Sequence, residues 1–218
     1  MVGITAIREA TLEGVQAANV EYEKWSGGWW VTDSGIEGHV VSTVARKLYG
    51  RVAGDGYVVM ELGFGIIQQW SGAGRPRGRP LPNLNEGNRA DIVILDKKER
   101  PIYVIEVKRL WDKRPCLDDL NRMRDLILKF GQEREGSLRR GLLAFLAVGR
   151  EANGTTARLA LENQVQGIGT VLEDEFDAKG LKLTCHQGSA RRYPKDYREQ
   201  HGEPNWVHAA VCLELRSA

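Results

Sequence analysis

The clearest hydrophobic pattern lies in the middle of the chain, where a short charged segment separates two apolar runs. Residues 91–95 and 102–108 are rich in Ile and Val, and residues 96–101 between them are mostly charged. Runs of β-branched residues favour strands, and near-continuous apolar character is typical of strands that are buried on both faces. We therefore predict a hairpin in the middle of a sheet.

Apolar positions at helical spacing predict helices on both sides of this hairpin. Residues 5–24 lack Pro and are rich in Ala, Glu, Val and Leu, and residues 117–130 carry an apolar stripe. A further helix is expected to begin at Ser34, its N-cap, and to end at Gly50. Two more strands are expected at 57–62 and 142–148.

These elements predict an α/β fold. From residue 34 to residue 149 the order is helix, strand, strand, strand, helix, strand, which is expected to give a central mixed sheet flanked by helices. The 218 residues suffice for one domain with additions. We expect residues 1–33 to be an N-terminal helical extension and residues 150–218 to be a C-terminal extension packing on the core. Weaker patterns in this last segment predict a helix and two strands, at 171–178, 181–185 and 207–215.

Composition narrows the function classes only slightly. The chain has 31 Lys plus Arg and 29 Asp plus Glu, so its overall charge does not predict a polyanionic partner. Its three cysteines are far apart and lack C-x-x-C spacing, which favours reduced thiols over disulfides or a zinc site. No apolar run approaches about 18 residues, so we expect a cytoplasmic protein without a membrane segment.

The strongest candidate chemistry lies on the predicted hairpin. Side chains two residues apart on a strand share a face, so Glu106 and Lys108 are expected side by side. Asp91 opens the partner strand and is a natural third member. Two carboxylates and the carbonyl of Val107 would form an oxygen-rich site suited to Mg²⁺.

The segment Arg89-Ala90-Asp91, followed after fourteen residues by Glu106-Val107-Lys108, resembles the motif of the PD-(D/E)XK nuclease superfamily. The resemblance implies a restriction-endonuclease-like core and hydrolysis of nucleic-acid phosphodiester bonds. DNA is the expected substrate, and endonuclease action is favoured over exonuclease action. Ala90 stands where the motif name has Pro, a position that shapes the turn.

The same resemblance implies roles for individual residues. Asp91, Glu106 and the Val107 carbonyl would bind Mg²⁺, for which Mn²⁺ is expected to substitute, and Lys108 would be the catalytic lysine. A Glu on the first core helix often completes the site, and Glu37 is the candidate. Segment 34–37 equally matches a capping box, in which Glu37 only closes the helix. Glu61 is the reserve candidate.

Contacts with nucleic acid are expected from basic residues around the motif. Residues 71–88 form a Pro- and Gly-rich segment, predicted to be a flexible loop with Arg75, Arg77 and Arg79 at alternate positions. Arg89 and Arg109 flank the hairpin strands, and Trp111 could add a stacking surface. The alternative is that these charges are simply solvated.

Three functions remain open on the sequence. The first is the nuclease, for which a cut in both strands of a duplex would favour a homodimer. The second is a non-catalytic nucleic-acid-binding or assembly subunit with a nuclease fold. The third is a scaffold domain in which some of the six Trp residues anchor protein partners.

Overall fold

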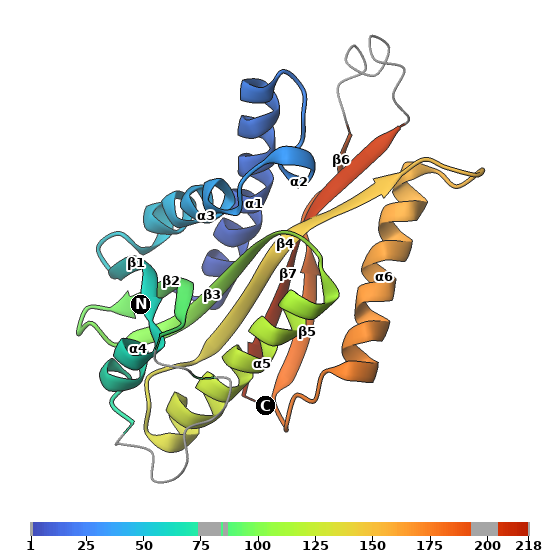
Figure 1. Ribbon diagram of the computed structural model, residues 1–218. Helices are drawn as coiled ribbons and strands as arrows, with labels where there is room; N and C mark the ends of the chain where they lie inside the picture. Colours follow the sequence, from blue (N-terminus) through green and yellow to red (C-terminus); the bar gives the residue numbers. More distant parts are fainter. Residues whose placement is uncertain (1, 74–83, 85–86, 193–204, 218) are drawn as a thin grey trace.

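The apolar runs of the sequence form the centre of a seven-stranded mixed sheet flanked by helices on both faces (Figure 1). This computed structural model describes residues 2–73, 84, 87–192 and 205–217. The sheet order is β1-β2-β3-β4-β7-β5, with β6 paired to β7. The strands are β1 (Gly56–Gly63), β2 (Arg89–Asp96), β3 (Pro101–Leu110), β4 (Arg140–Arg150), β5 (Lys182–Gln187), β6 (Arg191–Arg192) and β7 (Trp206–Arg216). Only β3 and β4 pair in parallel among these strands; the other pairs are antiparallel.

Two long helices cover one face of the sheet. They are α1 (Ile4–Ser26) and α3 (Glu37–Val52), connected through the short helix α2 (Val31–Ser34). Ile92 and Ile94 of β2 and Ile105 of β3 point toward this layer and share a core with the apolar sides of both helices. Residues at alternate positions of a strand face the same side, so the β-branched runs supply this face with every second side chain.

The remaining helices cover the other face. They are α4 (Phe64–Trp70), α5 (Lys113–Phe130) and α6 (Ala157–Glu175), with a short 3-10 helix at Gln132–Arg134. Val93, Val104 and Phe145 point into this second core, together with the apolar stripe predicted for 117–130. Strands β2 and β3 are thus buried on both faces, which confirms the predicted position of the hairpin.

Several predicted boundaries were wrong. Ser34 ends α2 instead of capping the next helix; the N-cap of α3 is Ile36, without a side-chain capping bond, so the capping box at 34–37 is not formed. The helix also continues past Gly50 to Val52. The helix expected at 171–178 is the end of the much longer α6. Helix α4 had not been predicted, because Gly63 and Gly65 suggested an irregular segment.

The last part of the chain belongs to the same sheet. Strand β7 pairs along its whole length with β4, and β5 pairs with the other side of β7. The chain end after β7 lies near the start of β5 in Figure 1. All three cysteines are free, as expected. Within the described ranges, no helix has the length and apolar character needed to cross a lipid bilayer.

Candidate functional site

The candidate site lies where β2 and β3 separate. The backbone pairing of β2 with β3 ends at Ile92 and Ile105. At the residue before Ile92, the side chain of Asp91 takes over from the β2 backbone as the hydrogen-bonding partner of β3. Its Oδ2 accepts a hydrogen bond from the backbone N–H of Val107 at 2.8 Å. The Asp91 carboxylate is therefore held beside β3, next to Glu106 and near Lys108, as the sequence predicted.

Asp91 and Glu106 form a carboxylate pair at the edge of the core. The two side chains share a hydrogen bond. Glu106 is 3% exposed, and its Oε1 is buried without a hydrogen-bond partner in the described part of the chain. Burial, followed by the negative charge of Asp91, raises the pKa of Glu106 to about 8. Burial also raises the pKa of Asp91. At neutral pH Glu106 thus holds the proton that this hydrogen bond needs.

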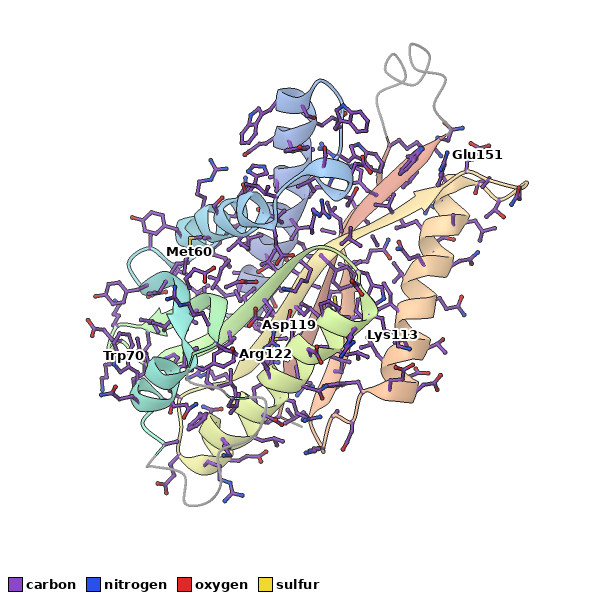
Figure 2. The ribbon with its side chains drawn as sticks, viewed as in Figure 1. Met60, Trp70, Lys113, Asp119, Arg122 and Glu151 are labelled. Atoms are coloured by element: carbon purple, nitrogen blue, oxygen red, sulfur yellow. The ribbon has the colours of Figure 1, made fainter. Side chains whose placement is uncertain are left out.

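Lys108 lies between two further carboxylates. Its Nζ is 3.2 Å from Glu37 Oε1 and 3.2 Å from Asp119 Oδ2. Asp119 is on α5, is 1% exposed, and forms an ion pair through its other oxygen with Arg122. Figure 2 shows Asp119 and Arg122 near the middle of α5, over the sheet. These contacts fix the ammonium group of Lys108 next to the carboxylate pair.

Asp119 and Arg122 were missed by sequence reasoning. The helix at 117–130 is predicted from its apolar residues, yet Asp119 adjoins Leu120 and lies three residues after Cys116, on the buried side of the helix. A carboxylate on a buried helical face is costly unless it is paired. That acidic residue within the apolar stripe was the available signal.

Glu37 begins α3 and binds β3 through both carboxylate oxygens. Oε1 pairs with Lys108, and Oε2 accepts a hydrogen bond from the backbone N–H of Arg109 at 3.4 Å. The Arg109 guanidinium in turn donates to the carbonyl oxygen of Gly35 at 2.9 Å. Glu37 is therefore part of the cluster, and its role as a metal ligand stays a prediction.

The other predicted contacts are spread more widely. Arg89 is exposed at the start of β2, while Arg75, Arg77 and Arg79 lie outside the described residues. Glu61 is exposed on β1, beside the strand that carries Asp91. Trp111 is partly buried and packs against Phe145 of the core, with ring centroids 5.2 Å apart; a stacking role for its ring stays a prediction.

The carboxylate pair fits the requirements of a Mg²⁺ ion. Mg²⁺ prefers oxygen ligands, needs only one or two carboxylates, and usually retains several waters. The buried Glu106 Oε1 lacks a partner among the described residues, and burial together with the neighbouring charge of Asp91 raises the pKa of Glu106, as expected for two carboxyl groups without enough positive charge beside them. Asp91 and Glu106 would hold the ion, with the Val107 carbonyl as a third oxygen. In the described segments no group of three or more His, Cys, Asp or Glu side chains is arranged to hold a metal ion, so waters and substrate would complete the shell.

Comparison of the chain with protein-family models, with curated proteins and with solved structures gave no significant match.

Proposed function

We propose that this protein is a metal-dependent nuclease with a restriction-endonuclease-like core, and that it hydrolyses phosphodiester bonds of DNA. The observation that carries the proposal is the carboxylate pair of Asp91 and Glu106, with its buried unpartnered oxygen, beside the fixed ammonium group of Lys108. A purely structural cluster would be expected to give each buried carboxylate oxygen a cationic or hydrogen-bonding partner, and Glu106 Oε1 has none among the described residues.

The residues of the site suit the steps of phosphodiester hydrolysis. A Mg²⁺ ion held by Asp91 and Glu106 would supply a bound water of lowered pKa and a positive charge next to the phosphoryl oxygen. A water oxygen attacks phosphorus and gives up a proton to solvent, the bond from phosphorus to the leaving deoxyribose oxygen breaks, and that oxygen takes up a proton from solvent. Lys108 stabilises the negative charge that builds up on the phosphoryl oxygens, or orients the attacking water. Asp119 and Glu37 keep its ammonium group in place.

The order of elements supports the proposed core. Along the chain, α3, β1, β2, β3, α5 and β4 follow the predicted sequence of helix, three strands, helix and strand. The motif residues lie on the second and third of these strands, at the end where those strands separate. In the described residues, two short pieces of regular structure are inserted within that order, helix α4 and the 3-10 helix at Gln132–Arg134.

The test is cleavage of a panel of linear duplex, circular, single-stranded and branched DNA, with RNA included, in the presence of Mg²⁺ or Mn²⁺. We expect wild-type activity that Lys108→Ala abolishes. The matched control is Lys113→Ala, because Lys113 is exposed at the start of α5 and pairs with Glu175 away from the carboxylate pair. Circular dichroism would confirm that both variants fold. Equal cleavage by the wild type and Lys108→Ala would overturn the proposal.

One observation favours a second candidate, a non-catalytic nucleic-acid-binding or assembly subunit. Lys108 is engaged by two carboxylates, an arrangement that also serves as a purely structural ion-pair cluster. Binding of DNA without cleavage, unchanged by Lys108→Ala and by Mg²⁺, would support this candidate. Sedimentation with and without duplex DNA would test the homodimer that cutting both strands favours.

A further inference from the structure

A separate cavity of about 460 Å³ lies at the far end of β3 from the candidate site. Its lining includes Tyr103 near the start of β3, Arg140 at the start of β4 with Arg139 just before it, and Arg216 at the end of β7. Tyr103 precedes Glu106 by three residues, or roughly 10 Å of strand, and faces the opposite side of the sheet. This arginine cavity is therefore distinct from the carboxylate pair.

Strand pairing builds the cavity from side chains that are distant in sequence. Tyr103 is paired with Arg140, and Arg140 is paired with Arg216, so the three residues form one row across β3, β4 and β7. Residues directly opposite one another in adjacent strands point to the same face. The register therefore brings two arginines into one row facing the α1 layer, and Arg139 joins them from the residue before β4.

The arginine cavity has more positive than negative charge. Arg140 is paired with Glu214 at 2.5 Å, but Glu214 also binds Arg8 at 3.0 Å, so its single charge is shared. In the described ranges neither Arg139 nor Arg216 has a carboxylate within ion-pair distance, and none of the lining residues is acidic. The Nε of Arg139 is buried and has no hydrogen-bond partner among the described residues. A buried guanidinium nitrogen without an acceptor is costly, which indicates that an acceptor belongs there.

The start of α1 reinforces this charge. Gly3, the N-cap, gives no side-chain capping bond, and the first turn of the helix contains no acidic residue. The free N–H groups at a helix N-terminus carry partial positive charge. Tyr103 donates a hydrogen bond to the carbonyl oxygen of Val2 at 3.4 Å, which holds this end of the helix at the cavity.

We propose that the arginine cavity binds a small phosphate-bearing anion through the guanidinium groups of Arg139 and Arg216. Guanidinium groups match phosphate oxygens with two parallel hydrogen bonds, and the cavity volume falls in the usual range for small-ligand sites. Gln132, which also lines the cavity, supplies a side-chain amide beside the charged groups. The proposal does not depend on the proposed nuclease activity.

The test is isothermal titration of the full chain with inorganic phosphate, adenosine monophosphate and adenosine. We expect both phosphate compounds to bind with a Kd below about 1 mM and adenosine not to bind. Arg139→Gln and Arg216→Gln should each weaken binding at least tenfold, and Arg139→Lys should weaken it less. The matched control is Arg158→Gln, because Arg158 is exposed on α6 and should leave binding unchanged. Arg140 is left intact because its removal would take away one of the two arginines that pair with the buried Glu214.

The remaining outcomes decide against the proposal. Equal phosphate binding by the wild type and both Gln variants would show adventitious contact elsewhere on the surface. No binding by a folded wild type would also overturn it. Unchanged binding in Lys108→Ala is expected, and loss of binding in that variant would place the phosphate at the carboxylate pair instead.

Discussion

Glu106 and Lys108 are two residues apart on β3, yet their charges are compensated differently. Lys108 contacts carboxylates from two helices, Glu37 on α3 and Asp119 on α5. Glu106 has Asp91 beside it, and the pair keeps one proton because burial and mutual repulsion raise the pKa of Glu106 to about 8. A divalent cation would relieve that repulsion, so Asp91 and Glu106 are expected to be its main protein ligands.

Replacement of Glu106 by Gln therefore separates metal binding from folding. The wild type should gain stability with added Mg²⁺, by about 2.7 kcal/mol at a hundredfold excess over the Kd. Glu106→Gln should lose this gain, measured as the shift in Tm with added Mg²⁺. Without metal the variant should be as stable as the wild type at pH 7, since a neutral amide replaces a protonated carboxyl group. If Mg²⁺ raised the Tm of Glu106→Gln as much as that of the wild type, the proposed metal site would be contradicted. The same measurement on Glu37→Gln tests whether Glu37 is a metal ligand.

Asp119 is expected to act through Lys108. Asp119→Asn would leave the ammonium of Lys108 and the guanidinium of Arg122 without their shared buried partner. We expect kcat on DNA to fall about 10- to 100-fold, as for other outer partners of metal sites, with KM little changed. Asp118→Asn is the matched control, because Asp118 is exposed one position away. An equal loss in both variants would indicate a general effect on α5, and recovery in Asp119→Glu would support the positioning role.

Some of these site residues could be predicted from the sequence and others could not, for a physical reason. Asp91, Glu106 and Lys108 stood out because charged residues interrupt apolar strands, where side-chain direction follows from position alone. Asp119 and Arg122 approach from α5, and only the packing of that helix on β3 shows which of its charges reach the site. Glu37 was placed correctly in the cluster, although the helix begins at a different residue than expected.

At the scale of elements, the strands were more predictable than the helices. Buried strands β2, β3 and β4 need apolar residues on both faces, so each forms an unmistakable run. Helix α6 buries only four residues, Ala157, Leu161, Ile168 and Leu172, and contains Gly167 and Gly169. Its apolar stripe is narrow and its helix propensity is weakened by glycine, so its first half gave no clear signal.

Close packing of α6 on β4 depends on Gly149. A Cβ at this position would collide with the carbonyl oxygen of Ala157 and the backbone nitrogen of Leu161. Gly149→Ala should therefore lower the free energy of unfolding by roughly 1–3 kcal/mol, because backbone atoms of α6 must move. Gly167→Ala is the matched control: it lies on α6 with open space around it and should add about 0.5–1 kcal/mol. Urea denaturation measures the free energy of unfolding of both variants. Equal changes in the two variants would contradict the close contact at Gly149.

At the scale of the whole molecule, the two ends of the chain form part of the same core as the predicted nuclease segment. Ile7, Val15 and Ala18 of α1 are fully buried against α3 and the sheet. Strand β7 supplies the neighbour of β4 on the other side from β3. The sequence could not show this, because pairing between β4 and β7 joins residues about 70 positions apart through alignment of two apolar runs.

His208 joins these two ends of the chain. It lies on β7, 2% exposed, with Trp30 against its ring and Asn19 and Gln16 of α1 at 3.2 Å from its two nitrogens. Asn19 Oδ1 accepts from the backbone N–H of Val31, so Asn19 Nδ2 donates to His208 Nε2. The imidazole is thus held neutral, and burial, followed by the charge of Arg191, lowers its pKa to about 4.

This buried histidine should make the fold sensitive to acid. Below pH 6.5 the unfolded chain binds a proton at His208 that the folded protein does not, so stability falls as the pH drops from about 6.5 to 4. The total loss is roughly 3 kcal/mol, and it levels off below the folded pKa. In His208→Gln the free energy of unfolding should change less with pH across this window. Urea titration at half-unit pH steps measures it. His186→Gln is the control, because His186 is more exposed and should leave most of the loss in place. Parallel pH curves for the wild type and His208→Gln would show that the contact between α1 and β7 does not depend on a neutral imidazole.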